Sequence, residues 1–91
     1  MVIEAIVENP DAKKELFSKL DRLSPPEAIL ASNTSYLDIY EFVETRQPGK
    51  VIITHWFAPP HIIPLVEIVP GPHTSPDTVG IVKKILDELG K

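Results

Sequence analysis

The apolar residues of this 91-residue chain follow two patterns that alternate along the sequence. Short continuous apolar runs predict strands that are buried on both faces, and apolar residues spaced three or four apart predict amphipathic helices. The predicted order is strand, helix, strand, short helix, strand, strand, helix. The strands are expected at residues 2–7, 28–32, 51–57 and 65–69, and the helices at 10–23, around Leu37, Tyr40 and Val43, and from 76 to Gly90.

Both long predicted helices begin with the same signal. Asn9-Pro10-Asp11 and Ser75-Pro76-Asp77 each supply an N-cap side chain, a proline at the first helical position and an acid in the first turn. In the first helix Lys13 falls on the polar face, together with Lys14, Lys19 and Arg22. The apolar face of that helix consists of Ala12, Leu16, Phe17, Leu20 and Leu23.

Strands that alternate with helices predict an α/β fold with a mostly parallel sheet and helices on both faces. In such sheets ligands bind beyond the carboxyl ends of the strands. The polar residues at these positions are the segment 32–35, after one strand, and His55, near the end of another. These residues are therefore the first candidates for a functional site.

Composition excludes several classes of function. The net charge of −4 comes without a basic patch, so nucleic acid and anionic membranes are not expected as partners, and no apolar run is long enough to span a bilayer. The chain has no cysteine, which excludes a disulfide framework and a thiolate zinc site and fits a cytoplasmic protein. His61 and His73 lie in proline-rich segments without a second ligand at suitable spacing, so no metal is expected.

His55 and Glu67 are ionisable residues within two apolar runs. A lone histidine in a strand is commonly a structural residue, and this reading leads when His55 is considered alone. Glu67 changes the balance, because burying a carboxylate without a partner costs several kcal/mol. Two readings remain open: a strand whose face with Leu65, Glu67 and Val69 is exposed, or a buried His55–Glu67 pair at the ligand edge of the sheet.

Two longer strings carry a family resemblance. VIEAIVENPDAKKELFSKLDRLSPPEAILASNTSYL, followed by THWFAPPHIIPLVEIVPGPHTS, resembles the later half of the NAD-binding domain of the 3-hydroxyacyl-CoA dehydrogenases. The most specific parts are ASNTS, the H-x-F before a proline-rich turn, and PLVE, in this order and spacing. The resemblance implies that residues 1–91 are a single partial domain, the C-terminal half of a Rossmann-like dinucleotide-binding domain with NAD as cofactor.

The resemblance also implies roles for individual residues. His55 is expected to be the general base that removes the proton from a substrate hydroxyl, and Glu67 to orient its imidazole. Ser35 is expected to hydrogen-bond the substrate hydroxyl and to lie near the nicotinamide, although residues 33–35 could instead cap the next helix.

The remaining family positions concern the dinucleotide. Ala5, through its backbone, and the side chains of Glu8 and Lys13 fall where the family contacts NAD, in addition to Ser35. The alternative for Glu8 and Lys13 is a solvated position at a loop and a helix start.

The chain departs from the family pattern in two respects. Ala58 stands where most members have an asparagine that helps to hold substrate and nicotinamide, so either turnover is weaker or the substrate differs. The turn PPHIIPLVE resembles that of gulonate and carnitine dehydrogenases, so a hydroxy acid of that type is the alternative to a 3-hydroxyacyl-CoA. The glycine-rich turn G-x-G-x-x-G that binds the pyrophosphate is absent.

These departures lead to an expectation about the whole chain. It reads as an enzyme fragment from fatty acid β-oxidation, inactive alone, which needs the missing N-terminal half and C-terminal helical domain or another subunit. It is expected to self-associate into a homo-oligomer. The rival hypothesis is a noncatalytic α/β module that binds a partner through an exposed sheet edge.

Overall fold

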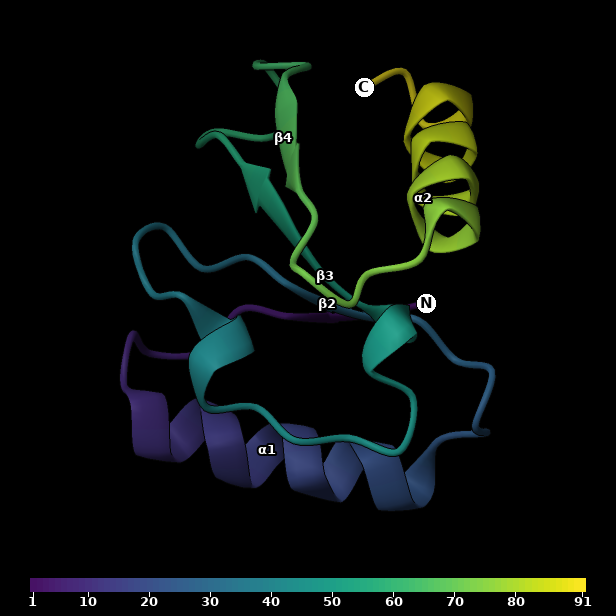
Figure 1. The fold of residues 1–91 in the computed structure, drawn as a ribbon. Helices are drawn as coiled ribbons and strands as arrows, with labels where there is room; N and C mark the ends of the chain where they lie inside the picture. The colour runs from purple at the N-terminus through teal and green to yellow at the C-terminus, as the bar shows by residue number, and fades with distance from the viewer.

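The computed structural model describes residues 1–91 and shows one sheet between two helices (Figure 1). Helix α1 covers one face of the sheet and helix α2 covers the other. The fold is therefore α/β with helices on both faces, as the sequence predicts. Its elements are β1 (Val2–Glu4), α1 (Pro10–Leu23), β2 (Leu30–Ser32), the 3-10 turns η1 (Ile39–Glu41) and η2 (Pro48–Lys50), β3 (Val51–Trp56), β4 (Val66–Val69) and α2 (Pro76–Glu88).

The four strands lie in the order β1-β2-β3-β4. β1 with β2 and β2 with β3 are parallel, whereas β3 and β4 are antiparallel, so the sheet is mostly parallel as predicted. β1 and β4 are the edge strands. In the antiparallel pair Ile53 lies opposite Val69, and His55 lies opposite Glu67.

The helix start signals act as the sequence predicts. The side chain of Asn9 accepts a hydrogen bond from Ala12 N at 3.0 Å, and that of Ser75 accepts one from Thr78 N at 3.2 Å. Each cap satisfies a backbone donor that has no partner inside its helix. Helix α1 has the predicted bounds, and neither helix is long and apolar enough to cross a membrane.

Each face of the sheet has its own apolar core. Alternate residues of a strand point to opposite faces, so β3 contributes Val51 and Ile53 to one core and Ile52 to the other. Fully buried Phe17 of α1 and Val82 of α2 anchor the two cores. The first core consists of Phe17, Leu30, Ile39, Val51 and Ile53, and the second of Ile29, Ala31, Ile52, Val82 and Leu86.

Several predicted elements are shorter than expected, and β2 begins at Leu30 and not at residue 28. The strand predicted at 2–7 ends at Glu4, because β2 is only three residues long and offers no further backbone partners. The helix predicted around Leu37, Tyr40 and Val43 is wrong, since only the 3-10 turn η1 forms there. Tyr40 and Val43 pack on the first core without the need for a regular helix.

Candidate active site

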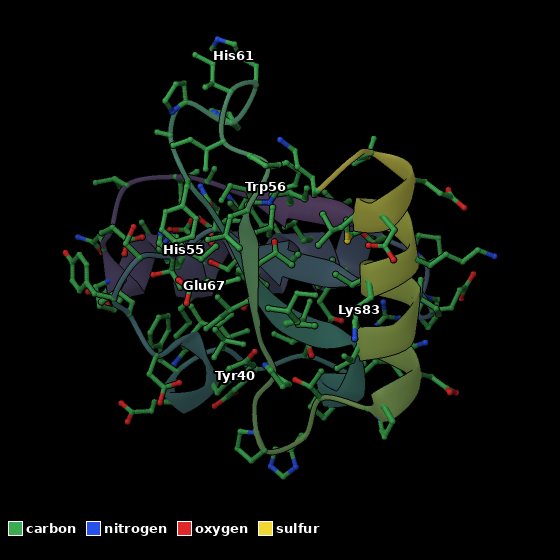
Figure 2. All side chains as sticks on the ribbon, turned by 90° about the horizontal axis from the view of Figure 1, so that it is seen from above. Tyr40, His55, Trp56, His61, Glu67 and Lys83 are labelled. Atoms are coloured by element: carbon green, nitrogen blue, oxygen red, sulfur yellow. The ribbon has the colours of Figure 1, made fainter.

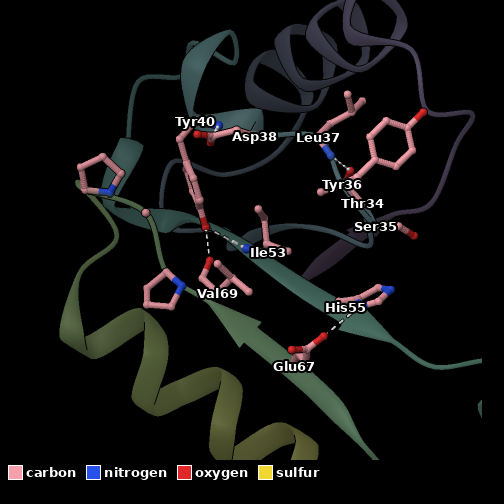
Figure 3. Close-up of a pocket in the computed structure, with 13 residues that line it drawn as sticks. Thr34, Ser35, Tyr36, Leu37, Asp38, Tyr40, Ile53, His55, Glu67 and Val69 are labelled. Atoms are coloured by element: carbon pink, nitrogen blue, oxygen red, sulfur yellow. Dashed lines mark hydrogen bonds and ion pairs between the residues drawn. The ribbon is translucent and has the colours of Figure 1, made fainter.

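His55 and Glu67 face one another across β3 and β4. His55 Nδ1 donates to Glu67 Oε1 at 3.1 Å (Figure 3). The ring of Phe57 lies 4.8 Å from the imidazole, centroid to centroid, at an interplanar angle of 51°. With Nδ1 used in this way, Nε2 is the nitrogen left to accept a proton from another molecule.

The pair is only partly buried, so of the two open readings the exposed strand face is the one that the structure has. The Glu67 side chain is 55% exposed and that of His55 is 24% exposed. Val69 of β4 and Leu65, just before that strand, are also exposed. The pair is exposed because β4 is an edge strand and this face of β3 and β4 borders a pocket. The pairing and the exposed strand face, which were alternatives in the sequence, occur together.

The pocket beside the pair has a volume of about 420 Å³. Its rim is formed by the segment after β2, the turn η1 and the segment after β4, as Figure 3 shows. Asp38 and Glu67 are its charged acids, and the lining contains no lysine or arginine. The lining residues are Thr34, Ser35, Tyr36, Leu37, Asp38, Tyr40, Ile53, His55, Glu67, Val69, Pro70, Gly71 and Pro72.

The polar segment after β2 is fixed beside this pocket by its own side chains. Asn33 Oδ1 accepts a hydrogen bond from Trp56 N at 2.8 Å, which ties the segment to β3 next to His55. Thr34 Oγ1 accepts a hydrogen bond from Leu37 N at 3.1 Å, whereas the N-cap of η1 is Asp38, so residues 33–35 do not cap that turn. The Ser35 hydroxyl makes no hydrogen bond within the chain and is exposed at the pocket. It is free to bind a ligand.

Lys13 lies inside the molecule and not in solvent, contrary to the expectation from the helix face. Its side chain is fully buried, and Nζ contacts Glu4 Oε2 at 2.5 Å, Glu8 Oε1 at 3.1 Å and the backbone oxygen of Ile6 at 3.3 Å. An ammonium group has three N–H donors, so these three acceptors use all of them. Burial of Lys13 is stable because two carboxylates neutralise it.

Sequence reasoning missed Glu4, which is the centre of this buried cluster. Glu4 is 3% exposed, and its carboxylate also accepts hydrogen bonds from Ser32 Oγ at 2.5 Å and Ile6 N at 2.8 Å. The signal was present, because Glu4 interrupts an apolar run in the same way as Glu67 does. The nearest cation, Lys13, lay on a helix face that the periodicity assigned to solvent.

Glu8 connects the buried cluster to the candidate site. Its Oε2 accepts hydrogen bonds from Thr34 Oγ1 at 2.7 Å and from Ser35 N at 3.2 Å. Burial is the largest single influence and opposes ionisation, but these hydrogen bonds and the charge of Lys13 together outweigh it and lower the pKa of Glu8 below 4.5. Glu8 is therefore a carboxylate at neutral pH.

The residues expected to contact NAD are partly suited to it. Ala5 is exposed at the carboxyl end of β1, and the Glu8 side chain is 25% exposed, so backbone and carboxylate are both accessible to ribose hydroxyls. Lys13 has no donor left for a cofactor and instead holds Glu8. The chain's glycines, at 49, 71, 80 and 90, form no phosphate-binding turn. The fit covers part of a dinucleotide only.

The other two histidines lie apart from this site. His61 sits in the exposed loop between β3 and β4, at the end remote from Tyr40 (Figure 2). His73 is exposed in the segment before α2. No group of three or more His, Cys, Asp or Glu side chains gathers in a way that could hold a metal ion.

Comparison with protein families gives a match along the entire chain. Residues 1–91 match the family described as "3-hydroxyacyl-CoA dehydrogenase, NAD binding domain". A probable 3-hydroxybutyryl-CoA dehydrogenase of Bacillus subtilis is 46% identical over 92 residues, and the peroxisomal bifunctional enzyme of Cavia porcellus is 39% identical. Both alignments include 100% of this chain, but only 32% and 13% of the respective relative. The chain thus spans less than a third of these proteins.

Solved structures show the same fold. The crystal structure of 3-hydroxybutyryl-CoA dehydrogenase from Escherichia coli superposes with a TM-score of 0.95 at 35% identity, over 99% of this chain and 19% of that one. A 3-hydroxyacyl-CoA dehydrogenase from Archaeoglobus fulgidus gives a TM-score of 0.89 at 41% identity, over 99% of this chain and 32% of that one.

Proposed function

This chain belongs to the family of NAD-binding domains of 3-hydroxyacyl-CoA dehydrogenases, and we propose its function on that basis. The proposed reaction is the oxidation of a 3-hydroxyacyl-CoA to the 3-ketoacyl-CoA, within an enzyme of which this chain is one part. The observation that carries the proposal is the His55 Nδ1–Glu67 Oε1 hydrogen bond at the edge of a pocket.

The chain's residues would divide the work of proton removal. NAD, when bound, supplies the nicotinamide that accepts the hydride. Nε2 of His55 takes the hydroxyl proton, and Glu67 keeps the other ring nitrogen protonated and stabilises the imidazolium that forms. The free hydroxyl of Ser35 positions the substrate oxygen. General base catalysis of this kind contributes roughly 10² to 10⁴ in rate.

Cofactor binding is proposed to involve Ala5, Glu8 and Ser35 directly. Glu8 accepts hydrogen bonds from ribose hydroxyls, and Lys13 holds the Glu8 carboxylate in place. Glu8 also accepts a hydrogen bond from Ser35 N, so the same carboxylate contacts the cofactor and holds the residue that is proposed to bind the substrate.

The pocket favours an acyl-CoA over a free hydroxy acid of the gulonate type. A free carboxylate beside the reacting hydroxyl would meet Asp38 and Glu67 and no lysine or arginine of this chain. A thioester is neutral at that position and meets no repulsion. Carnitine is zwitterionic, so the charge argument applies to its carboxylate alone.

The chain covers only a small part of the length of its relatives, and this leads to a proposal about the rest of the enzyme. We propose that it is the C-terminal half of the NAD-binding domain, inactive alone, and that a preceding half and a helical domain or another subunit complete the site. Its relatives include a peroxisomal bifunctional enzyme and a peroxisomal fatty acid β-oxidation multifunctional protein. For this chain we propose a role in fatty acid β-oxidation and a location in the cytoplasm.

The test is a chimera in which this chain replaces the matching segment of the Bacillus subtilis relative. NADH formation is measured with 3-hydroxybutyryl-CoA, gulonate and carnitine as alternative substrates. The proposal predicts activity with the CoA ester and none from the isolated chain. A chimera that folds and binds NAD but oxidises none of these substrates would contradict a catalytic role.

A noncatalytic interaction module is the second candidate. The observation in its favour is the outer edge of β1, which has no strand partner in this chain and carries Ile3 with 43% of its surface exposed. Mixing the chain with a separately produced N-terminal half and C-terminal helical domain distinguishes the two hypotheses. Association without any NADH formation favours the module.

A further inference from the structure

Tyr40 links the two strands that carry the His55–Glu67 pair. Its hydroxyl accepts a hydrogen bond from Ile53 N at 3.0 Å and donates one to the backbone oxygen of Val69 (Figure 3). Ile53 and Val69 are opposite one another in the β3–β4 register, and His55 and Glu67 form the pair two residues further along. The hydroxyl therefore bridges Ile53 and Val69, the register pair that is closest to the His55–Glu67 pair on the same face of the sheet.

The ring of Tyr40 is held in one place by its surroundings. A Cβ atom added to Gly71 would lie 2.4 to 2.5 Å from three carbons of the ring, so only glycine leaves room for it there. Asp38 Oδ1 accepts a hydrogen bond from Tyr40 N at 3.1 Å and fixes the start of η1. The ring also packs on the first apolar core. Gly71 and the first apolar core thus hold Tyr40 in the position that the bridge requires.

Glu67 depends on strand geometry for its position. Its side chain is 55% exposed, and its hydrogen bond within the chain is the one with His55. β4 pairs only with β3, because it is an edge strand. The distance between the two side chains follows from the spacing of these strands at the pocket, where Tyr40 contacts both.

We propose that Tyr40 is a positioning residue: its hydroxyl fixes the spacing of β3 and β4 and thereby keeps Glu67 within hydrogen-bond distance of His55. Its catalytic consequence rests on the proposed function, but its structural consequence does not. Burial raises the pKa of Tyr40 above 10.0, which keeps the phenol protonated and able to donate to Val69 throughout the neutral range.

The structural test uses the isolated chain labelled with ¹⁵N. Tyr40→Phe keeps the ring against Gly71 but removes the bridge. It should accelerate hydrogen exchange at Ile53 N and shift the ¹⁵N signals of the His55 ring away from the tautomer protonated at Nδ1. Tyr36→Phe is the matched control, because Tyr36 lines the same pocket but is 74% exposed, and it should change neither signal.

A second variant disturbs the same bridge from the other side. Gly71→Ala pushes the ring of Tyr40 away and should change Ile53 and His55 in the same direction as Tyr40→Phe. If either folded variant accelerates exchange at Ile53 while the His55 ring signals superpose on those of the wild type, the positioning role is refuted. These signals require no turnover, so the outcome is independent of whether the dehydrogenase function is correct.

The catalytic consequence is measured in the chimera. Tyr40→Phe should lower kcat by roughly ten- to a hundredfold with little change in KM, because the reactants are misaligned and not unbound. Unchanged kcat together with shifted His55 signals would overturn the catalytic part of the inference. An inactive wild-type chimera would instead count against the proposed function.

Discussion

His55 and Glu67 occupy one register position of an antiparallel strand pair, so the ladder between β3 and β4 sets the hydrogen bond between them. Between them in sequence lie Trp56, which ends β3, the loop from 57 to 65, and Val66, which begins β4. Because both strands extend to the rim of the pocket, the pair stands where a ligand can reach Nε2 of His55.

The buried cluster predicts a large stability loss for Glu4→Gln. The substitution removes one of the two carboxylates that neutralise fully buried Lys13, and breaking a buried ion pair costs about 3 to 5 kcal/mol. Urea unfolding measures the change. Glu15→Gln is the control, because the exposed Glu15–Lys19 pair should contribute less than about 1 kcal/mol.

A double variant separates the charge effect from general damage. In Glu4→Gln combined with Lys13→Met the buried charge is removed together with its partner, so the loss should be smaller than the sum of the two single losses. Strict additivity would show that the ion pair is not the source of the effect.

Glu8 predicts a pH dependence of stability in the acid range. Its pKa is lowered in the folded protein, so its contribution is complete above 4.5 and is lost as pH falls through the folded value. The free energy of unfolding should therefore decline below about pH 4.5, and Glu8→Gln should flatten this decline. Glu44→Gln, at an exposed position, should leave the profile as in the wild type; equal slopes for all three proteins would contradict the assignment.

The isolated chain should bind NAD very weakly or not at all. It lacks the glycine-rich turn, and the residues suited to the cofactor at the sheet edge are few. Calorimetric titration with NAD is the measurement, and micromolar affinity would show that the sequence contains a phosphate site that its glycines do not reveal.

The unpaired edge of β1 should cause self-association. Backbone donors and acceptors on that edge have no partner, and the neighbouring apolar residues Ile3 and Val7 are 43% and 70% exposed. Light scattering should give a mass above that of the monomer, and Ile3→Lys should reduce it. A monomeric mass at high protein concentration would contradict self-association through the β1 edge.

The sequence predicted the elements whose patterns are local. Proline, cap and acid placed the start of α1 at Pro10, and continuous apolar runs identified β2, β3 and β4. It overestimated β1, whose length depends on how many residues of β2 are available to pair. It also predicted a helix around Tyr40, where packing on the core stabilises a single turn instead.

The candidate site was predictable in its residues but not in its surroundings. The spacing and strand context of His55 and Glu67 led to the pair, yet exposure depends on which elements cover β4, which local pattern does not specify. Lys13 was misplaced because helical periodicity cannot show that an acid on a neighbouring strand draws the amine inward. The bridge made by Tyr40 joins three separate segments and left no signal in the sequence.

The most direct test of the account is the turnover of the chimera with substitutions at the pair. His55→Ala and Glu67→Gln should each lower kcat by orders of magnitude while the Kd for NAD changes little, because the pair acts on the proton and not on the cofactor. Glu67→Gln should also leave stability within about 1 kcal/mol of the wild type, as the pair is partly exposed. If the His55→Ala chimera folds, binds NAD and turns over as fast as its parent, His55 is not the base and the central claim is wrong.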